Sequence, residues 1–146
     1  MLKQMATITI SRPVDHVFAF MANLENSPKW QSGVTDSKVI STGPLRVGTQ
    51  FSEVIKVIGR PVEALCEVIE YESGSKIGFR SSSSPAIQFE GHYSFEPNDG
   101  GTQLTYSGWT RLGGFWRLLE PLFGGEVNKE LAAELKRLKS LLETGN

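Results

Sequence analysis

Cysteine and histidine are scarce in this chain, and their scarcity excludes several kinds of site. Cys66 is the single cysteine, and His16 and His92 are the two histidines among 146 residues. One thiol cannot form an internal disulfide, and so few sulfur and imidazole ligands do not match a structural zinc site. We therefore expect no metal site, and we interpret Cys66 as a small buried hydrophobic residue rather than a nucleophile.

An excess of charge of one sign and long apolar runs are also absent. The 15 basic and 16 acidic residues give a formal net charge of −1 at pH 7, so no global field attracts nucleic acid or an anionic membrane. No stretch approaches the roughly 18 apolar residues of a membrane span, and the N-terminus has no apolar run of signal-peptide length. The sequence therefore predicts a cytoplasmic protein that partners neither nucleic acid nor an integral membrane site.

The common catalytic motifs are missing as well. The sequence contains no Gly-x-Ser-x-Gly elbow, no His-Glu-x-x-His pair, no phosphate-binding loop and no glycine fingerprint for dinucleotides. Each of these motifs positions a nucleophile, a metal or a phosphate in a defined way, so the enzyme classes that depend on them are excluded. We expect no cofactor.

Alternation with a period of two is the main pattern that is present. Seven segments are predicted to be strands because they alternate in this way or are rich in β-branched and aromatic residues: 6–11, 34–41, 49–58, 62–71, 76–81, 87–95 and 102–110. Gly59-Arg60-Pro61 and Asn98-Asp99-Gly100-Gly101 separate neighbouring segments and have the length of hairpin turns. The chain is the size of one domain, so we expect a single domain over 1–146 built on one antiparallel sheet.

A short helix is expected after the first strand. Ser11 is a candidate cap, Pro13 suits a first helical turn, and Asp15 places a negative charge near the helix N-terminus. An apolar stripe follows at Val14, Val17, Phe18 and Met21. The segment 23–28 predicts a second short turn, with Trp30 directly after it.

The C-terminal segment from about 115 to 142 has helical periodicity. Its apolar residues recur at spacings of four, four, three and four, at Val127, Leu131, Leu135, Leu138 and Leu142. Pro121 and Gly124-Gly125 interrupt its first half, which predicts either a kink or a separate turn over 115–123. A curved sheet with only one long helix to cover it tends to enclose space that can hold a ligand.

Short segments along the whole chain resemble a known family. They are Ser11-Arg12-Pro13 with Val17-Phe18, Asn26 to Trp30, Val47 to Phe51, Val68 to Tyr71, Gly101 to Tyr106, and the closing pattern Leu131 to Leu142. In order and spacing they resemble the polyketide cyclase/dehydrase group of the SRPBCC superfamily, which shares the helix-grip fold of START domains and birch-pollen-allergen-like proteins. The resemblance implies an α+β fold: a curved antiparallel sheet of six to seven strands wrapped around a long C-terminal helix, with two short helices after the first strand.

The family covers cyclases, dehydrases, lipid carriers and hormone sensors, so the resemblance implies a ligand cavity more directly than it implies catalysis. The first hypothesis is therefore the binding of a hydrophobic small molecule, such as a lipid, a polyketide or an aromatic metabolite. A cyclase or dehydrase is the second hypothesis. A protein-interaction module whose core is filled by side chains is the third, and a homodimer is one assembly left open.

Alternation indicates which side chains face the cavity. The expected inward sets are Phe51, Glu53, Ile55 and Val57; Ile77 and Phe79; Ile87, Phe89, Gly91, Tyr93 and Phe95; and Leu104 and Tyr106. His92 and Arg80 then face outward, or Arg80 lies at a rim. Within 62–71 both registers mix polar and apolar residues, so the inward face there stays undecided.

Candidate ligand-binding residues follow from these faces: Trp30, Phe51, Glu53, Ile55, Phe79, Phe89, Tyr93, Tyr106 and Trp109. Glu53 is a carboxylate in an apolar wall, which must be hydrogen-bonded, raised in pKa, or at the surface after all. The catalytic candidates are Glu53 with Tyr106 or Tyr93. Trp109, Phe115, Trp116 and Phe123 surround Gly113-Gly114, where they form a cavity entrance, a membrane-touching lip, or ordinary packing at the start of the helix.

Overall fold

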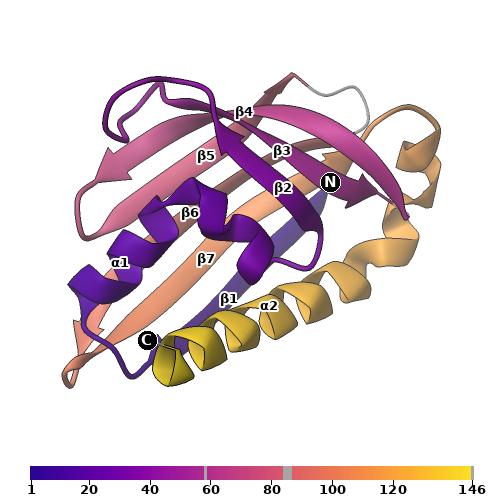
Figure 1. Cartoon of the computed structure of the whole chain (residues 1–146). Helices are drawn as coiled ribbons and strands as arrows, with labels where there is room; N and C mark the ends of the chain where they lie inside the picture. Colours follow the sequence, from indigo (N-terminus) through magenta and orange to yellow (C-terminus); the bar gives the residue numbers. More distant parts are fainter. Residues whose placement is uncertain (58, 84–86, 146) are drawn as a thin grey trace.

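The computed structural model describes residues 1–57, 59–83 and 87–145. Seven antiparallel strands form a sheet in the order β1-β7-β6-β5-β4-β3-β2 (Figure 1). All the expected strands are present, and most are longer than the alternation predicted. Their bounds are β1 Leu2–Ile10, β2 Val34–Val39, β3 Gln50–Val57, β4 Arg60–Glu72, β5 Lys76–Ser83, β6 Ile87–Asn98 and β7 Gly101–Leu112.

Strand β4 contains an irregularity that explains why its inward face could not be predicted. Ala64, Cys66 and Val68 are buried at alternate positions. A β-bulge then shifts the register between Val68 and Glu70, so that Tyr71 pairs with Ile77 and packs against the core. Because a bulge adds one residue to one strand, the inward set changes phase in the middle of β4.

Within the described residues, four helical elements accompany the sheet: α1 Val14–Ala22, the 3₁₀ helix η1 Leu24–Lys29, the 3₁₀ helix η2 Gly114–Phe123, and α2 Gly124–Thr144. The separate turn expected as one option before the last helix is therefore confirmed as η2. The expected cap at Ser11 is wrong: Pro13 is the N-cap residue of α1, no side chain caps it, and the Ser11 amide donates to Glu143 instead.

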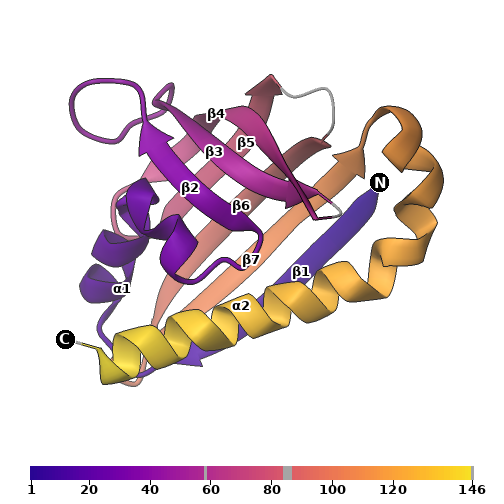
Figure 2. The same ribbon diagram turned by 45° about the vertical axis from the view of Figure 1, so that its right-hand side comes forward.

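Helix α2 crosses the concave face of the sheet, which curls around it (Figures 1 and 2). Most of its expected stripe is buried, at Leu131, Leu135, Leu138 and Leu142. Val127, at its N-terminal end, is only half-buried. The described residues hold no helix long and apolar enough to cross a membrane.

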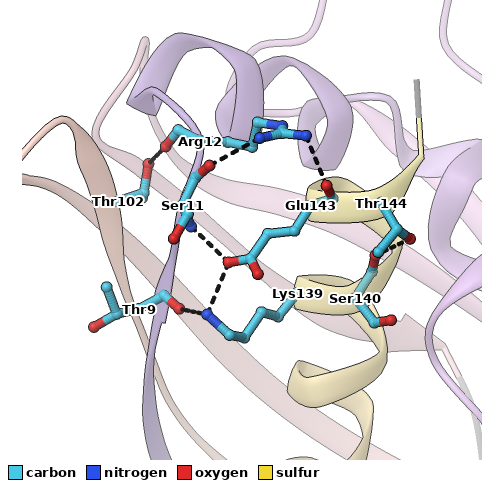
Figure 3. A network of polar contacts seen from close by, with 8 residues as sticks. All are labelled: Thr9, Ser11, Arg12, Thr102, Lys139, Ser140, Glu143 and Thr144. Atoms are coloured by element: carbon cyan, nitrogen blue, oxygen red, sulfur yellow. Dashed lines mark hydrogen bonds and ion pairs between the residues drawn. The ribbon is translucent and has the colours of Figure 1, made fainter.

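A polar network ties the C-terminal end of α2 to the end of β1 (Figure 3). Lys139 Nζ donates to the Thr9 carbonyl at 2.6 Å and to Glu143 Oε2 at 2.8 Å. The Ser11 amide donates to the same Glu143 oxygen at 2.7 Å, and Arg12 donates to the Glu143 carbonyl at 2.7 Å. The hydrogen bond from Lys139, with that from Ser11, holds the pKa of Glu143 below its usual value. This end of α2 is therefore fixed in place.

The buried apolar residues form two clusters. One joins α1 and α2 to β1, β6 and β7, and includes Leu104 and Leu135. The other lies on β3, β4 and neighbouring segments, and includes Phe51 and Val68. Phe79 packs against both clusters and joins them. Unfilled space lies between the sheet and the N-terminal half of α2.

Candidate functional site

A cleft that is open to solvent lies where the cavity was expected, between the sheet and the C-terminal helix; we call it the cavity, and it has two adjoining parts. An inner chamber of about 170 Å³ lies against the concave face of the sheet. An outer chamber of about 450 Å³ extends from it past Phe123 and Val127. The parts share lining residues from four strands, the loop before β2, and α2: Gln4, Gly33, Ile55, Ile87, Thr110, Leu131 and Glu134.

Six of the expected ligand-binding residues line the inner chamber: Glu53, Ile55, Phe79, Phe89, Tyr93 and Tyr106. Trp30 and Phe51 lie deeper, around a recess of about 20 Å³ that also borders Glu53. A space of that size holds about one water molecule. The side chain of Val57, expected on the same face, lies outside the described part.

Trp109 is the one candidate that lies away from the cavity. It borders a depression on the convex side of the sheet together with Met5, His92 and Ser107, and the Arg111 guanidinium lies 5.8 Å from its ring. Successive side chains of a strand point to opposite faces. Since Tyr106 faces inward, the third residue after it must face outward, and the expectation for Trp109 is corrected. Phe123 does line the outer chamber; the side chains of Phe115 and Trp116 lie outside the described part.

Aromatic rings form a continuous wall along the inner chamber. The Phe79 ring lies 6.3 Å from that of Phe51 and 5.9 Å from that of Tyr93, measured between centroids. The Tyr93 and Tyr106 rings are 4.7 Å apart, and Trp30 meets Tyr93 edge-to-face at 6.1 Å. Of these rings, those of Phe79, Tyr93 and Tyr106 line the inner chamber, while Phe51 and Trp30 border the deeper recess.

Two glycines give the Tyr106 ring its place. Gly91 and Gly108 are paired across β6 and β7, and a Cβ atom on either one would lie less than 3 Å from the Tyr106 hydroxyl. The ring therefore lies close against the backbone of the sheet, where no side chain other than hydrogen would fit. This arrangement keeps the ring out of the space that the inner chamber occupies.

Glu53 is a buried carboxylate without a partner. Its exposed fraction is 6 %, and no hydrogen bond or ion pair reaches it from the described residues. Burial raises its pKa to about 7, and the nearby charge of Glu134 adds to the effect. The expected register of β3 is confirmed, since Phe51 and Glu53 are buried while Lys56 is exposed.

Glu134 of α2 is a second carboxylate in the cavity, and the sequence analysis missed it. It lines both chambers, and its Oε2 accepts hydrogen bonds from the Ser32 amide at 3.0 Å and the Ser32 hydroxyl at 3.2 Å. Burial raises its pKa to about 7 although the bonds from Ser32 oppose the shift. A signal was available, because Glu134 follows Leu131 by three and precedes Leu138 by four, which places it on the apolar face.

Glu134 ends a line of carboxylates that we call the acidic ridge: Glu126, Glu130 and Glu134, spaced four residues apart on α2. Residues four apart lie on the same face of a helix. All three line the outer chamber, and Glu134 continues into the inner one. Lys56 is the one basic residue among the described residues that line either chamber.

The two tyrosines of the site can donate hydrogen bonds but do not act as bases near neutral pH. Burial raises the pKa of Tyr93 and of Tyr106, and neighbouring ionisable groups raise both further. Burial likewise raises the pKa of the Cys66 thiol, which agrees with a buried hydrophobic role. Among the residues that the structure describes, no cluster of three or more histidine, cysteine, aspartate and glutamate side chains could hold a metal ion.

The whole fold is similar to solved structures of low sequence identity. The protein TTHA0849 from Thermus thermophilus is 21% identical, with a TM-score of 0.82 and 99% of each chain covered. A START superfamily protein from Mycobacterium smegmatis is 14% identical, with a TM-score of 0.76 and 99% of each chain covered. The Zhui aromatase/cyclase from Streptomyces sp. R1128 is 15% identical, with a TM-score of 0.72 over 97% of this chain and 93% of that one.

These likenesses show the START-like helix-grip fold. No curated protein sequence matches the chain. The family model described as "Polyketide cyclase / dehydrase and lipid transport" matches residues 1–143. The family and the fold support a ligand-binding or cyclase role. The chain therefore belongs to the polyketide cyclase/dehydrase and lipid transport family.

Proposed function

We propose that the protein binds a hydrophobic small molecule in the cavity. One end of this molecule lies in the inner chamber, and the other end extends into the outer chamber. The observation that carries the proposal is the unfilled space beside the aromatic side chains of Phe79, Phe89, Tyr93 and Tyr106. Burial of an apolar ligand there yields about 25 cal/mol per Å² of apolar surface removed from water. A few polar groups at fixed positions then set its orientation. The unfilled space argues against an interaction module with a filled core.

Ligand binding is expected to stabilise the folded protein. A neutral apolar dye such as N-phenyl-1-naphthylamine, present at about 100 times its Kd, adds about 2.7 kcal/mol to the free energy of unfolding. That corresponds to a rise of several degrees in Tm, measured by differential scanning fluorimetry with tryptophan emission. Native mass spectrometry of the purified protein tests the same proposal for a ligand acquired during expression.

A matched control separates the cavity from the surface. Leu131→Trp places a large side chain at a position that lines both chambers, and it should abolish the dye's effect on Tm. Leu122→Trp adds the same side chain at an exposed position and should leave the effect intact. Stabilisation that persists in the Leu131 variant would place the dye outside the cavity and contradict the proposal.

A cyclase or dehydrase is the second candidate, favoured by a carboxylate whose pKa is about 7 inside an aromatic cavity. In this hypothesis Glu53 removes a proton from a carbon between two carbonyls, and the resulting enolate carbon attacks a ketone of the same chain. Tyr93 or Tyr106 donates a hydrogen bond to the carbonyl oxygen. The protonated Glu53 then returns its proton to the alkoxide that the attack forms. Glu53 next removes the second proton of the attacking carbon and delivers it to the departing hydroxyl, so that a carbon–carbon double bond forms and one water leaves.

The enzyme hypothesis has its own test. The protein is incubated with linear β-ketoacyl thioesters, and cyclised product lacking one water is measured by mass spectrometry. Glu53→Gln is expected to abolish product formation while retention of the thioester stays close to that of the wild type, because the side chains are nearly isosteric. Product formed equally by wild type and variant would reject Glu53 as the acid–base residue.

The cytoplasmic location and any homodimer stay predictions.

A further inference from the structure

The ionisable side chains that line the inner chamber are all acidic, and the binding of a purely hydrophobic ligand does not require this. Its ionisable lining residues are the carboxylates of Glu53 and Glu134 and the phenols of Tyr93 and Tyr106. No basic side chain lines the inner chamber within the described ranges, and Lys56 borders only the outer one. The polar surface offered to a ligand is therefore acidic.

The Glu53 carboxylate has no hydrogen-bonding or ionic partner among the described residues. It comes from the middle of β3, its exposed fraction is 6 %, and it borders both the inner chamber and the deeper recess. A buried carboxylate without a partner is costly, whereas one paired with a cation and hydrogen-bonded is not. No residue in the described part of the chain supplies that cation. A cationic group of a ligand would therefore gain the most binding free energy next to the Glu53 carboxylate.

The second carboxylate is held in place. The Ser32 amide donates to Glu134 Oε2 at 3.0 Å. The Ser32 hydroxyl has one hydrogen to donate and lies 2.5 Å from Glu130 Oε1 and 3.2 Å from Glu134 Oε2. Arg137 donates to the Trp30 carbonyl at 2.7 Å. These bonds hold the loop before β2 against α2, so Glu134 lines the chamber from α2 in a defined position.

Acidic side chains also line the outer chamber. Glu126 and Glu130 of the acidic ridge are exposed and line the outer chamber. A cleft lined by charges of one sign concentrates ligands of the opposite sign. The aromatic wall adds to this preference, because the faces of tyrosine and tryptophan rings attract cations.

We propose that the ligand of this cavity carries a protonated amine, which sits between Glu53 and Glu134 while its hydrophobic body lies along the aromatic wall. This inference rests on the proposed binding function and specifies the chemical class of its ligand. Three probes with one skeleton test it: 2-(1-naphthyl)ethylamine, 2-(1-naphthyl)ethanol and 1-naphthylacetate. Their affinities are measured at pH 8 by displacement of N-phenyl-1-naphthylamine and by calorimetry.

The amine is expected to bind at least roughly tenfold more tightly than the alcohol, and the carboxylate most weakly, because a cation gains charge-assisted hydrogen bonds that a neutral group lacks. In Glu53→Gln and Glu134→Gln the advantage of amine over alcohol should fall to about threefold or less, with the affinity for the alcohol nearly unchanged. Glu63→Gln removes one charge at an exposed site on the neighbouring strand β4 and should retain the full preference.

The outcomes separate this inference from the proposed function. If the dye binds but amine and alcohol bind equally, or the carboxylate binds best, the amine is rejected and hydrophobic binding stands. An amine preference that survives in both glutamine variants also rejects it, since the cation then sits elsewhere. If neither the dye nor any probe binds, the proposed function fails and this inference fails with it. Thermal melts of each variant confirm that the protein tested is folded.

Discussion

Glu53→Gln is expected to raise the free energy of unfolding by about 3 kcal/mol at pH 8 and by less than about 1 kcal/mol at pH 5. The pKa of Glu53 rises from 4.5 in its usual state to about 7 in the fold, chiefly through burial. The folded protein therefore binds this proton more tightly than the unfolded chain does. Glutamine keeps the shape of the side chain and removes the ionisation.

The direction of the pH effect follows from that shift. The contribution of Glu53 to the free energy of unfolding is greatest below pH 4.5, falls as the pH rises toward 7, and is constant above pH 7. The groups that face Glu53 are Glu134 of α2, Tyr93 of β6, Tyr106 of β7 and Cys66 of β4. Glu134 has its pKa raised in the same direction, so its ionisation enlarges the gain at pH 8.

Urea denaturation of wild type and variant at pH 5 and pH 8 measures this difference. Glu63→Gln, on an exposed position of β4, serves as the matched control and should change stability by less than about 0.5 kcal/mol at either pH. A Glu53→Gln effect that is the same at both pH values would contradict the raised pKa. A loss of stability at pH 8 would show that the ionised carboxylate is satisfied in the fold.

Leu135→Ala is expected to destabilise the protein by about 2–5 kcal/mol. The side chain is 1% exposed and lies in the cluster that joins α2 to the sheet. Its truncation removes apolar burial and leaves a cavity that the fixed C-terminal end of α2 cannot close by moving. A loss of this size would be a large part of the stability of a domain, which is typically about 5–15 kcal/mol.

The same substitution at an exposed leucine provides the control. Leu118 of η2 is 77% exposed, so Leu118→Ala should change the free energy of unfolding by less than about 0.5 kcal/mol. Both variants are compared with the wild type by urea denaturation at one pH. A loss below about 1 kcal/mol for Leu135→Ala would mean that the stripe of α2 contributes little to the fold.

The strands, their order along the chain and much of the cavity wall could be predicted from the sequence. The apolar alternation of β3 placed Phe51 and Glu53 on one face, and that of β6 placed Phe89 and Tyr93 on one face; both sets are buried. Such patterns are local, because successive side chains of a strand point to opposite sides of the sheet. The buried face is also strongly specified, since a shift of one residue would expose the whole apolar set. Trp109 follows the same rule: it stands three residues after the inward-facing Tyr106 and lies on the convex side of the sheet, so its expected place in the cavity was wrong.

Other features depend on contacts between distant parts of the chain. The bulge in β4 arises from its pairing with β5, and no pattern within β4 itself marks where the phase changes. Glu134 stands on the apolar face of α2 in the sequence, yet its role depends on Ser32, which is 102 positions away. Helical spacing alone does not say which strand or loop a side chain will meet.

By itself, the sequence determined that this chain forms an antiparallel sheet with one long covering helix, because periodicity and turn residues act over a few positions. Only the tertiary structure decided that a carboxylate of β3 and one of α2 line the same chamber, and that both have a pKa of about 7. Burial and the distance between charges set a pKa, and both are properties of the packed molecule rather than of any segment. The acidic character of the cavity is therefore a product of how the helix lies across the sheet.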